Sequence, residues 1–287
     1  MKGVHLKQLF ELNLATLFIS TSGALGKFID MPTPVIIWWR CSLAILFLYV
    51  FIKLRKIKFR LYSKKDVSTI IISALLTGAH WITYFYALKL SNVALGMLSL
   101  FVYPIITALL EPFFMKVKFD PIYILLGFMV LLGLYILAPE LNIESSYVKG
   151  ILFGLLSAVC YAVRILISKK LVRNYNGTIL MFYQLFILTI VLLPALYFMD
   201  TSGIKAQFPY VITLALITTA IGHTMLVHSL KHFTASTASI ISSAQPIFGI
   251  IIAYFFLYEI PTWNTFFGGS IILATVFIES MRSRKKI

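Results

Sequence analysis

Long apolar runs separated by short polar stretches make up almost the whole chain. Each run has the length of a transmembrane helix, which needs about 20 mostly apolar residues. Only helices or closed barrels can span lipid, and none of the runs alternates strictly as a barrel strand would. The pattern therefore predicts an all-α integral membrane protein with ten transmembrane helices, at 9–28, 34–52, 67–88, 92–115, 121–138, 149–171, 178–199, 209–230, 235–258 and 262–281.

The second half of the chain repeats the first at one constant shift along the sequence, without gaps. The shift aligns the predicted helix boundaries, and it pairs Lys27 with Lys169, Lys89 with Lys231, Pro104 with Pro246, Phe113-Phe114 with Phe255-Phe256, and Gly127 with Gly269. Because each half holds an odd number of helices, the halves must insert in opposite directions. We therefore expect two inverted five-helix repeats, 1–145 and 146–287, with a binding site near the midplane where they meet.

Composition favours a bilayer over water as the surroundings of this chain. Hydrophobic residues make up 60% of the 287 residues and charged residues 12%, against about 45–50% and about 25% in soluble domains. The net charge of +15 lies in short loops, which leaves no basic face for a nucleic acid. Cys41 and Cys160 lie inside apolar runs and form neither a disulfide framework nor a metal site.

Lys and Arg are distributed unequally between the two sets of predicted loops. Nineteen of the 25 lie on the side that holds both termini, and four lie on the other side. Since cytoplasmic loops carry the excess of Lys and Arg, we expect both termini to be cytoplasmic. We place the chain as a multi-pass protein of the bacterial inner (plasma) membrane.

Two prolines interrupt the fourth and the ninth predicted helices at matching places. A proline inside a helix removes one backbone hydrogen bond, and Pro104 and Pro246 lie about 17 Å from the start of their helices, close to mid-bilayer. Free carbonyls at that depth are tolerated beside protein or water, so we predict kinks that border a central cavity. Tyr103, Ser242 and Gln245 are expected to line it. The alternative is that the kinks serve packing alone.

Aromatic and imidazole side chains gather on the third and eighth predicted helices. Trp81 and Tyr84 share a helical face, because residues three apart are neighbours on a helix, and the repeat pairs Trp81 with His223. We predict that these three side chains bind substrate; packing or lipid contact is the alternative. Imidazoles at membrane depth are rare, so His80 is predicted to act in gating or coupling, with a structural role equally open.

Glu111 and Arg164 are two charged residues near the cytoplasmic ends of their predicted helices. A lone buried charge is costly, so each needs a partner or water. We predict that they form a pair, or a gate, at the inner mouth. Alternatively, Arg164 extends toward Lys169 and Lys170, and Glu111 reaches the headgroups.

Arg40 and Asn13 are polar residues of the first two predicted helices. Arg40 lies about 9 Å from the outer start of its helix, beside Trp38 and Trp39, which are typical of an interfacial aromatic belt. We therefore interpret Arg40 as structural rather than substrate-binding. Asn13 shares a helical face with Ser20 and is expected to contribute a polar group to the cavity.

The segment SAQPIFGIIIAYFFLYEIPTWNTFFGGSIILA, residues 243–274, resembles the EamA-type branch of the drug/metabolite transporter superfamily. It has that family's pattern of a proline in helix nine, a glutamate (Glu259) at the end of that helix, and a glycine-bearing tenth helix. Arg40 resembles an arginine often found in helix two. The first half departs from the pattern, because Val117 stands where Glu259 would match. The resemblance covers nearly the whole chain and implies ten helices in two repeats and transport of small molecules.

These features favour a secondary transporter, a permease that exports small organic metabolites, such as amino acids or aromatic compounds, by alternating access. No nucleotide-binding loop is present, so a gradient must drive transport; proton coupling and facilitated diffusion both stay open. We expect no catalytic residue, cofactor or metal; the expected partners are the solute and the lipid bilayer, with a homodimer left open. The alternative is an intramembrane lipid- or metabolite-modifying enzyme, but HExxH, GxSxG and paired carboxylates within a span are absent from the sequence.

Overall fold

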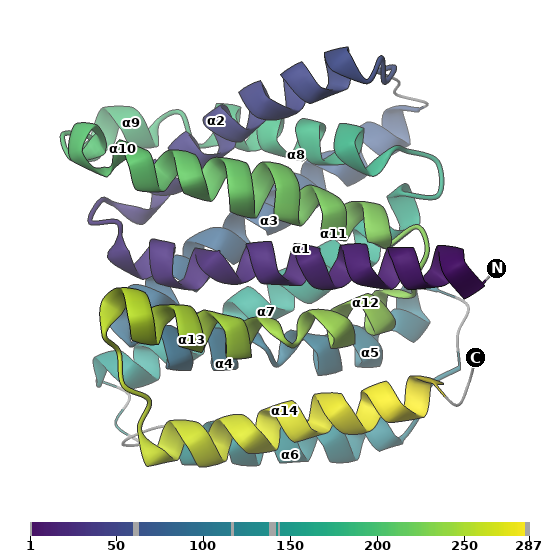
Figure 1. Cartoon of the computed structure of the whole chain (residues 1–287), viewed down its shortest axis with the longest axis vertical. Coiled ribbons are helices and arrows are strands. Elements are labelled where there is room, and N and C mark those ends of the chain that lie inside the picture. The colour runs from purple at the N-terminus through teal and green to yellow at the C-terminus, as the bar shows by residue number, and fades with distance from the viewer. Residues whose placement is uncertain (1, 60–62, 116–117, 138–141, 143, 285–287) are drawn as a thin grey trace.

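The computed structural model describes residues 2–59, 63–115, 118–137, 142 and 144–284. Within these ranges the regular structure is helical throughout, and Figure 1 shows the helices side by side with their connections at two opposite ends. This arrangement confirms the all-α membrane fold that the sequence predicts.

The helices of the first half are α1 (Lys2–Phe28), α2 (Thr33–Leu54), α3 (Lys64–Leu90), α4 (Val93–Leu100), α5 (Tyr103–Phe114) and α6 (Ile122–Leu137). Those of the second half are α7 (Ser146–Leu171), α8 (Gly177–Val191), α9 (Ala195–Phe198), α10 (Ile204–Thr213), the π-helix η1 (Leu214–His223), α11 (Thr224–Ser229), α12 (Ala235–Ser242), α13 (Gln245–Leu257) and α14 (Trp263–Arg284).

Eight helical segments in the described part of the chain are long and apolar enough to cross a membrane. They are α1, α2, α3 and α7, and four segments built from consecutive helices, namely α4–α5, α8–α9, α10–α11 with η1 between them, and α12–α13. α6 is apolar but has 16 residues, and α14, with 22 residues, packs along it. The count of ten spans therefore stays a prediction, with α6 and α14 as the remaining two.

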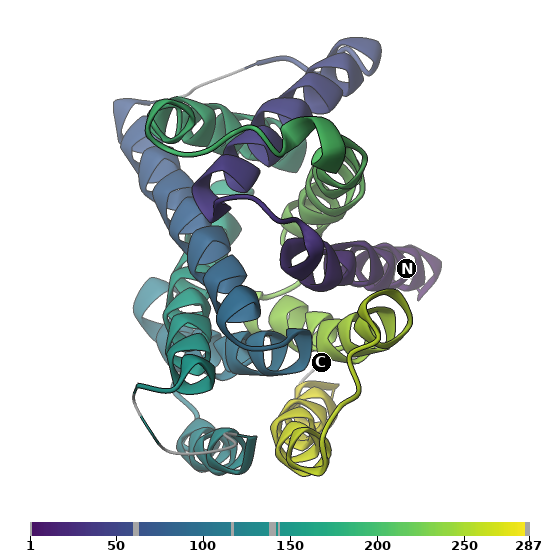
Figure 2. The ribbon, with the colours of Figure 1, turned by 90° about the vertical axis from the view of Figure 1, so that its left-hand side faces the viewer.

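Helices from the two halves of the chain pack against each other throughout the bundle. α3 contacts α7, α2 contacts α8, and α1 contacts η1 and α13. α4 contacts α13, α5 contacts α12, and α6 contacts α14, a pair that Figure 2 shows at one edge of the bundle. Because each of these contacts joins one half to the other, both halves build the interior.

Two membrane-spanning segments are broken at matching places. The shift that carries Pro104 onto Pro246 also carries both ends of α4 onto those of α12, and the start of α5 onto that of α13. The two prolines lie at these breaks, but they do not bend continuous helices as expected: each takes the second position of a new helix. Proline fits there because the first helical positions need no backbone N–H donor.

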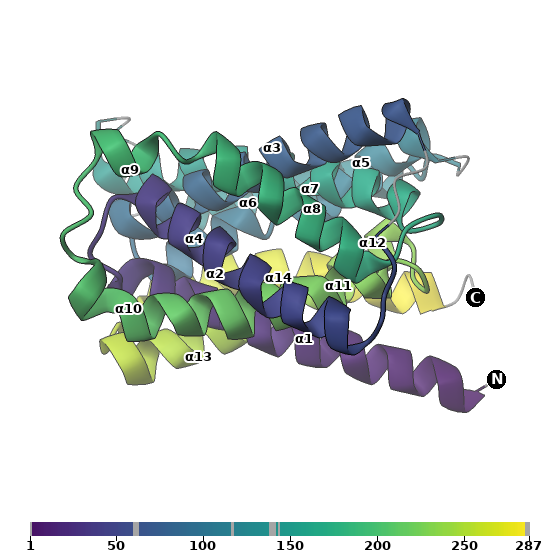
Figure 3. The same ribbon diagram turned by 90° about the horizontal axis from the view of Figure 1, so that it is seen from above.

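Both described chain ends lie at the same end of the bundle, which we call the terminal end. α1 begins there and α14 finishes there, as Figures 1 and 3 show. The α1–α2 and α13–α14 connections lie at the opposite end, which we call the distal end (Figure 1). The start of α12 and the end of α5 lie toward the terminal end, and the start of α4 and the end of α13 toward the distal end.

Candidate substrate-binding site

Eight polar and aromatic side chains from five helices lie together inside the bundle, and we call them the central cluster. Each is buried, with at most 3% of its surface exposed. They are Arg40 on α2, His80, Trp81 and Tyr84 on α3, Tyr103 on α5, Tyr161 and Arg164 on α7, and His223 on η1. Six of the eight are residues that the sequence singles out as substrate, gate or coupling candidates.

The rings of the central cluster contact one another across helix boundaries. His80 stacks on Tyr161 with 4.2 Å between ring centroids, and Tyr103 packs edge-on against Tyr161 at 4.6 Å. Trp81 lies 5.2 Å from His223, its partner in the repeat. Aromatic surfaces from α3, α5, α7 and η1 therefore enclose one region between the two halves.

Arg40 points into this region and not toward the membrane interface. Its Nε donates to Thr219 Oγ1 at 2.5 Å, and its Cζ lies 3.9 Å from the Trp81 ring centroid, a cation–π contact. Nη1 and Nη2 are buried and make no hydrogen bond with the protein. Arg40 therefore lies in the interior and not at the membrane interface, while its predicted structural role stays a prediction.

Arg164 also has only neutral partners. Its Nη2 donates to Gln184 Oε1 at 3.4 Å and lies 3.6 Å from Met181 Sδ, while its buried Nε makes no hydrogen bond. Gln184 in turn donates to Ser73 Oγ at 2.8 Å. With 1% of its surface exposed, Arg164 does not extend toward the lysines at the end of α7.

Glu111 does not pair with Arg164; instead it caps the first turn of α12. Its carboxylate accepts hydrogen bonds from the backbone N–H groups of Ala235, at 3.2 Å, and Ser236, at 3.4 Å, and from the Ser236 hydroxyl. A negative charge is stabilised at a helix N-terminus, where backbone N–H groups are unpaired. The expected ion pair is wrong because this helix start, distant in sequence, offers Glu111 a nearer set of donors.

Glu259 makes the equivalent contact at the other end of the bundle. Its Oε2 accepts from the backbone N–H of Val93, the first residue of α4, at 2.8 Å. The side chains that cap the two helix starts also match, since Asn92 accepts from the N–H of Leu95 and Thr234 from that of Thr237. Each broken segment thus ends in a carboxylate that holds the start of the other.

A lysine accompanies each of these carboxylates. Lys27 Nζ donates to the carbonyl oxygens of Lys89 and Ser91, at 3.3 and 2.7 Å, and lies within electrostatic range of Glu259. Lys169, its repeat partner, donates to two carbonyl oxygens of the α11–α12 connection at 2.7 and 2.6 Å and lies within range of Glu111. We call Glu259 and Lys27, with the start of α4 and its cap Asn92, the Glu259 latch; it lies at the distal end. Glu111 and Lys169, with the start of α12 and its cap Thr234, form the Glu111 latch at the terminal end.

The π-helix η1 shapes the wall opposite α3. Thr219 Oγ1 donates to the Leu214 carbonyl five residues earlier, at 3.1 Å, and Thr218 Oγ1 lies 2.8 Å from Thr21 Oγ1 on α1. π-Helices are rare and often lie at functional sites. η1 supplies both the acceptor for Arg40 and the ring of His223, and the predicted helix pattern contained no sign of it.

The remaining candidates divide into two groups. Gln245 is buried and its Nε2 makes no hydrogen bond, and Ser242 is buried at the end of α12. Tyr103 donates its hydroxyl to the Ser239 carbonyl at 3.3 Å. Asn13 does not line the interior as expected: it is exposed, and its side chain donates to the Leu9 carbonyl one turn earlier.

Three residues of the site were not predicted from the sequence. Tyr161 and Thr219 resemble many other polar residues in apolar runs, so no signal marked them. Gln184 did have a recognisable signal in the sequence. Burying an amide in the middle of an apolar span costs free energy unless the amide has hydrogen-bond partners.

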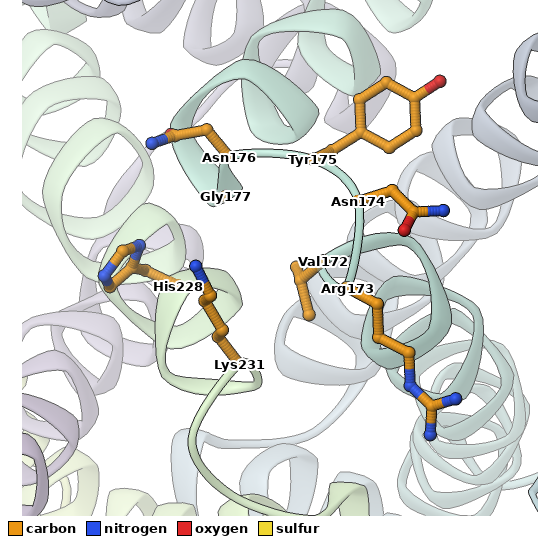
Figure 4. A pocket seen from close by; sticks show the side chains of 8 residues that line it. All are labelled: Val172, Arg173, Asn174, Tyr175, Asn176, Gly177, His228 and Lys231. Carbon is orange, nitrogen blue, oxygen red and sulfur yellow. The ribbon is translucent and has the colours of Figure 1, made fainter. Parts of the chain in front are cut away.

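Two pockets open at opposite ends of the bundle. One, of about 160 Å³, lies between the α7–α8 connection and α11 (Figure 4). His228 and Lys231 lie on one wall, and Gly177 is needed opposite them, because a Cβ there would lie 2.9 Å from the His228 backbone. The other, of about 150 Å³, is lined by Asn92 and Glu259 of the Glu259 latch, among others. The central cluster is buried between them.

Comparison with known proteins gives a consistent result. The EamA-like transporter family matches residues 9–138 and 148–281. An uncharacterized transporter of Archaeoglobus fulgidus is 26% identical over 68% of this chain and 70% of its own length. The S-adenosylmethionine uptake transporter of Rickettsia prowazekii is 30% identical over 42% of this chain and 41% of its own.

Two further matches cover nearly the whole chain. The pseudopaline exporter CntI of Pseudomonas aeruginosa is 22% identical over 95% of both chains. A solved crystal structure superimposes with a TM-score of 0.73 at 17% identity, covering 97% of this chain and 98% of its own. The bundle described above is therefore a fold already observed experimentally.

Proposed function

Because the chain belongs to the EamA-like transporter family, we propose that it carries a small organic solute across the membrane through the central cluster. The observation that carries this proposal is the position of the cluster: charged and aromatic side chains are buried between two pockets at opposite ends. A solute site that opens to one side at a time is what alternating access requires.

In this proposal the two latches are the gates. Each ties the start of one broken segment to the end of the other through a carboxylate on backbone N–H groups. Releasing the Glu111 latch would open the terminal end, and releasing the Glu259 latch would open the distal end. Because the latches share no residue, one can open while the other stays closed.

Residues 1–145 and 146–287 act as two inverted repeats in this mechanism. The equal spacing of α4 and α12, of α5 and α13, and of the two lysines supports the assignment. Rocking of one repeat against the other would exchange the open end while the central site stays in place.

For orientation, we propose that the terminal end faces the cytoplasm of a bacterium, with the protein in the inner membrane. The excess of Lys and Arg in the connections at that end supports this assignment. We propose export as the direction, supported by the similarity to the pseudopaline exporter over nearly the full length of both chains. A proton gradient or the solute gradient alone supplies the driving force.

Proteoliposomes that contain the purified chain test the proposal. We expect saturable, protein-dependent flux of at least one unmodified amino acid or aromatic metabolite from a labelled panel. Accumulation against a gradient under an imposed pH difference indicates proton coupling, and simple equilibration indicates facilitated diffusion. Chemical conversion of the solutes without flux would contradict the proposal and favour a membrane enzyme.

A further inference from the structure

Arg40 and Arg164 bring two positive charges into the interior of the bundle, within electrostatic range of each other. Their side-chain partners among the described residues are a hydroxyl, an amide and a sulfur, all of them neutral. Arg40 Nη1, Arg40 Nη2 and Arg164 Nε make no hydrogen bond at all. A buried charge without a partner is strongly destabilising, so its retention calls for an explanation outside the folded chain.

Five carboxylates in the described part of the chain have partners other than these two arginines. Glu111 and Glu259 hold helix starts in the two latches. Glu11 pairs with Lys7, Asp120 with Arg282, and Asp66 accepts from the Tyr175 hydroxyl. In the described ranges neither Arg40 nor Arg164 forms a salt bridge. A bound anion would supply the counter-charge that these carboxylates do not provide.

We propose that the transported solute carries a carboxylate that binds between Arg40 and Arg164, and a flat apolar part that stacks on the rings of the central cluster. This inference rests on the proposed function, since it names the class of solute for the same site. A guanidinium presents its N–H groups in a planar fork that matches a carboxylate. Trp81 Nε1 and the Tyr161 hydroxyl, which have no partner in the protein, add two donors beside it.

The same charges select against a cationic group on the solute. An ammonium in the central cluster would face two guanidinium groups and find no carboxylate to pair with, and juxtaposed like charges are repulsive. An organic anion should therefore bind better than an amino acid of the same skeleton. The sequence predicts amino acids or aromatic compounds as solutes, and the inferred charge preference favours the organic anions among them.

Four compounds with one phenyl skeleton test the charge preference directly. Hydrocinnamate is an anion, phenylalanine a zwitterion, hydrocinnamamide is neutral, and phenethylamine is a cation. Added to the purified full chain in detergent, hydrocinnamate should raise the melting temperature with half-saturation at a concentration about tenfold lower than phenylalanine. Phenethylamine should give no shift. Equal responses to all four, or no response to hydrocinnamate, would overturn the inference.

Variants of the two arginines link the response to the site. Arg40→Gln and Arg164→Gln should each raise the half-saturating concentration of hydrocinnamate by about 30-fold or more. The lysine variants keep the charge but lose the fork, so they should bind with intermediate strength. Arg55→Gln, at an exposed position outside both pockets, is the matched control and should not change binding.

Folding of each variant and transport by the protein are measured in separate experiments. A failure of the anion site can then be distinguished from a failure to fold or to transport. Melting without ligand shows whether a variant folds, and the lysine variants provide the test if a glutamine variant does not. Unchanged hydrocinnamate binding in folded arginine variants would refute the anion site. Flux of phenylalanine or the amide with no flux of hydrocinnamate would refute the inference but leave transport intact. Arginine-dependent binding of hydrocinnamate with no flux of any compound would refute the proposed function alone.

Discussion

Arg40 and His80 are both buried in the interior of the bundle, but they differ in how many of their polar atoms have hydrogen-bond partners in the protein. His80 Nδ1 lies 2.7 Å from Ser157 Oγ, whose hydroxyl donates to the His80 carbonyl at 2.9 Å. Both contacts tie His80 to α7 through one neutral hydroxyl. Arg40 is held by one N–H only and has two more groups unpaired. His80 thus has a polar partner in the protein for its ring nitrogen Nδ1, whereas two nitrogens of Arg40 have none.

Replacing Arg40 with methionine should separate stability from function. Removing an uncompensated buried charge in favour of a similar apolar volume should leave the free energy of unfolding unchanged or raise it by about 1–4 kcal/mol. Transport should be lost. Thermal unfolding in detergent and proteoliposome flux measure the two effects, with exposed Arg55→Met as the control. A lower melting temperature for Arg40→Met would show that the guanidinium stabilises the fold.

Asn13 shows the limit of reasoning from single residues. Trp81, Tyr84 and His223 were found because they are conspicuous in apolar runs, and they do lie inside the bundle. Asn13 is just as conspicuous on α1 but is exposed. Which face of a helix turns inward depends on its neighbours, and a span apolar on most of its surface does not reveal it.

At the scale of elements, the molecule is organised by two broken helical segments that hold each other. Asn92 and Thr234, one repeat apart, cap the starts of α4 and α12 in the same way. Glu259 and Glu111 then bind the same two starts from the opposite segment. Each of these helix starts is therefore capped by one side chain from its own half and one carboxylate from the other half. The two broken segments thus link the two halves of the chain.

Loss of either capping side chain should have the same effect. Asn92→Ala and Thr234→Ala should each lower stability by about 1 kcal/mol, and the double variant by their sum, because the sites are at opposite ends. Ser145→Ala is a suitable control, since Ser145 precedes α7 without making a side-chain cap. Melting in detergent measures all four variants. A much larger effect at one site would contradict their equivalence.

Neutralising the two carboxylates should open opposite ends. Glu111→Gln and Glu259→Gln each remove a charge from a helix start, which should cost about 1 kcal/mol and raise the population open at that end about fivefold. The readout is labelling of Gln245→Cys by an impermeant maleimide, after Cys41 and Cys160 are changed to alanine. Labelling from the terminal side should rise only in Glu111→Gln, and from the distal side only in Glu259→Gln. Equal increases from both sides in both variants would exclude separate gates.

At the scale of the whole molecule, the two ends are built alike but differ in charge. Two repeat-related lysines and two carboxylates that the repeat does not pair close the two ends. Most of the Lys and Arg residues, however, belong to the loops and helix ends that the sequence assigns to the side of the two termini. In the proposed mechanism the similar ends let the molecule open in either direction, and the charge asymmetry would direct its insertion.

Reporter fusions should reveal this orientation. Green fluorescent protein at the C-terminus should fluoresce in intact bacteria, and alkaline phosphatase inserted after the exposed Ser202, in the α9–α10 connection, should be active. Both results follow if the terminal end is cytoplasmic. Active phosphatase at the C-terminus would reverse the assignment.

The sequence by itself determined the all-helical membrane architecture, the duplication and the register of the two breaks. These features are readable locally, because in lipid each helix must satisfy its own backbone hydrogen bonds and so needs a long apolar run. The shift that pairs Pro104 with Pro246 also aligns α4 with α12.

Only the tertiary structure decided which polar groups meet. Glu111 contacts Ser236, 125 residues away, and Arg40 contacts Thr219, 179 residues away. Such partners depend on how each helix is rotated and on which element packs beside it, and a nearly uniform apolar span carries little of that information. In the described residues the same packing gives Arg40 and Arg164 no salt bridge, while Glu259 and Glu111 bind helix starts.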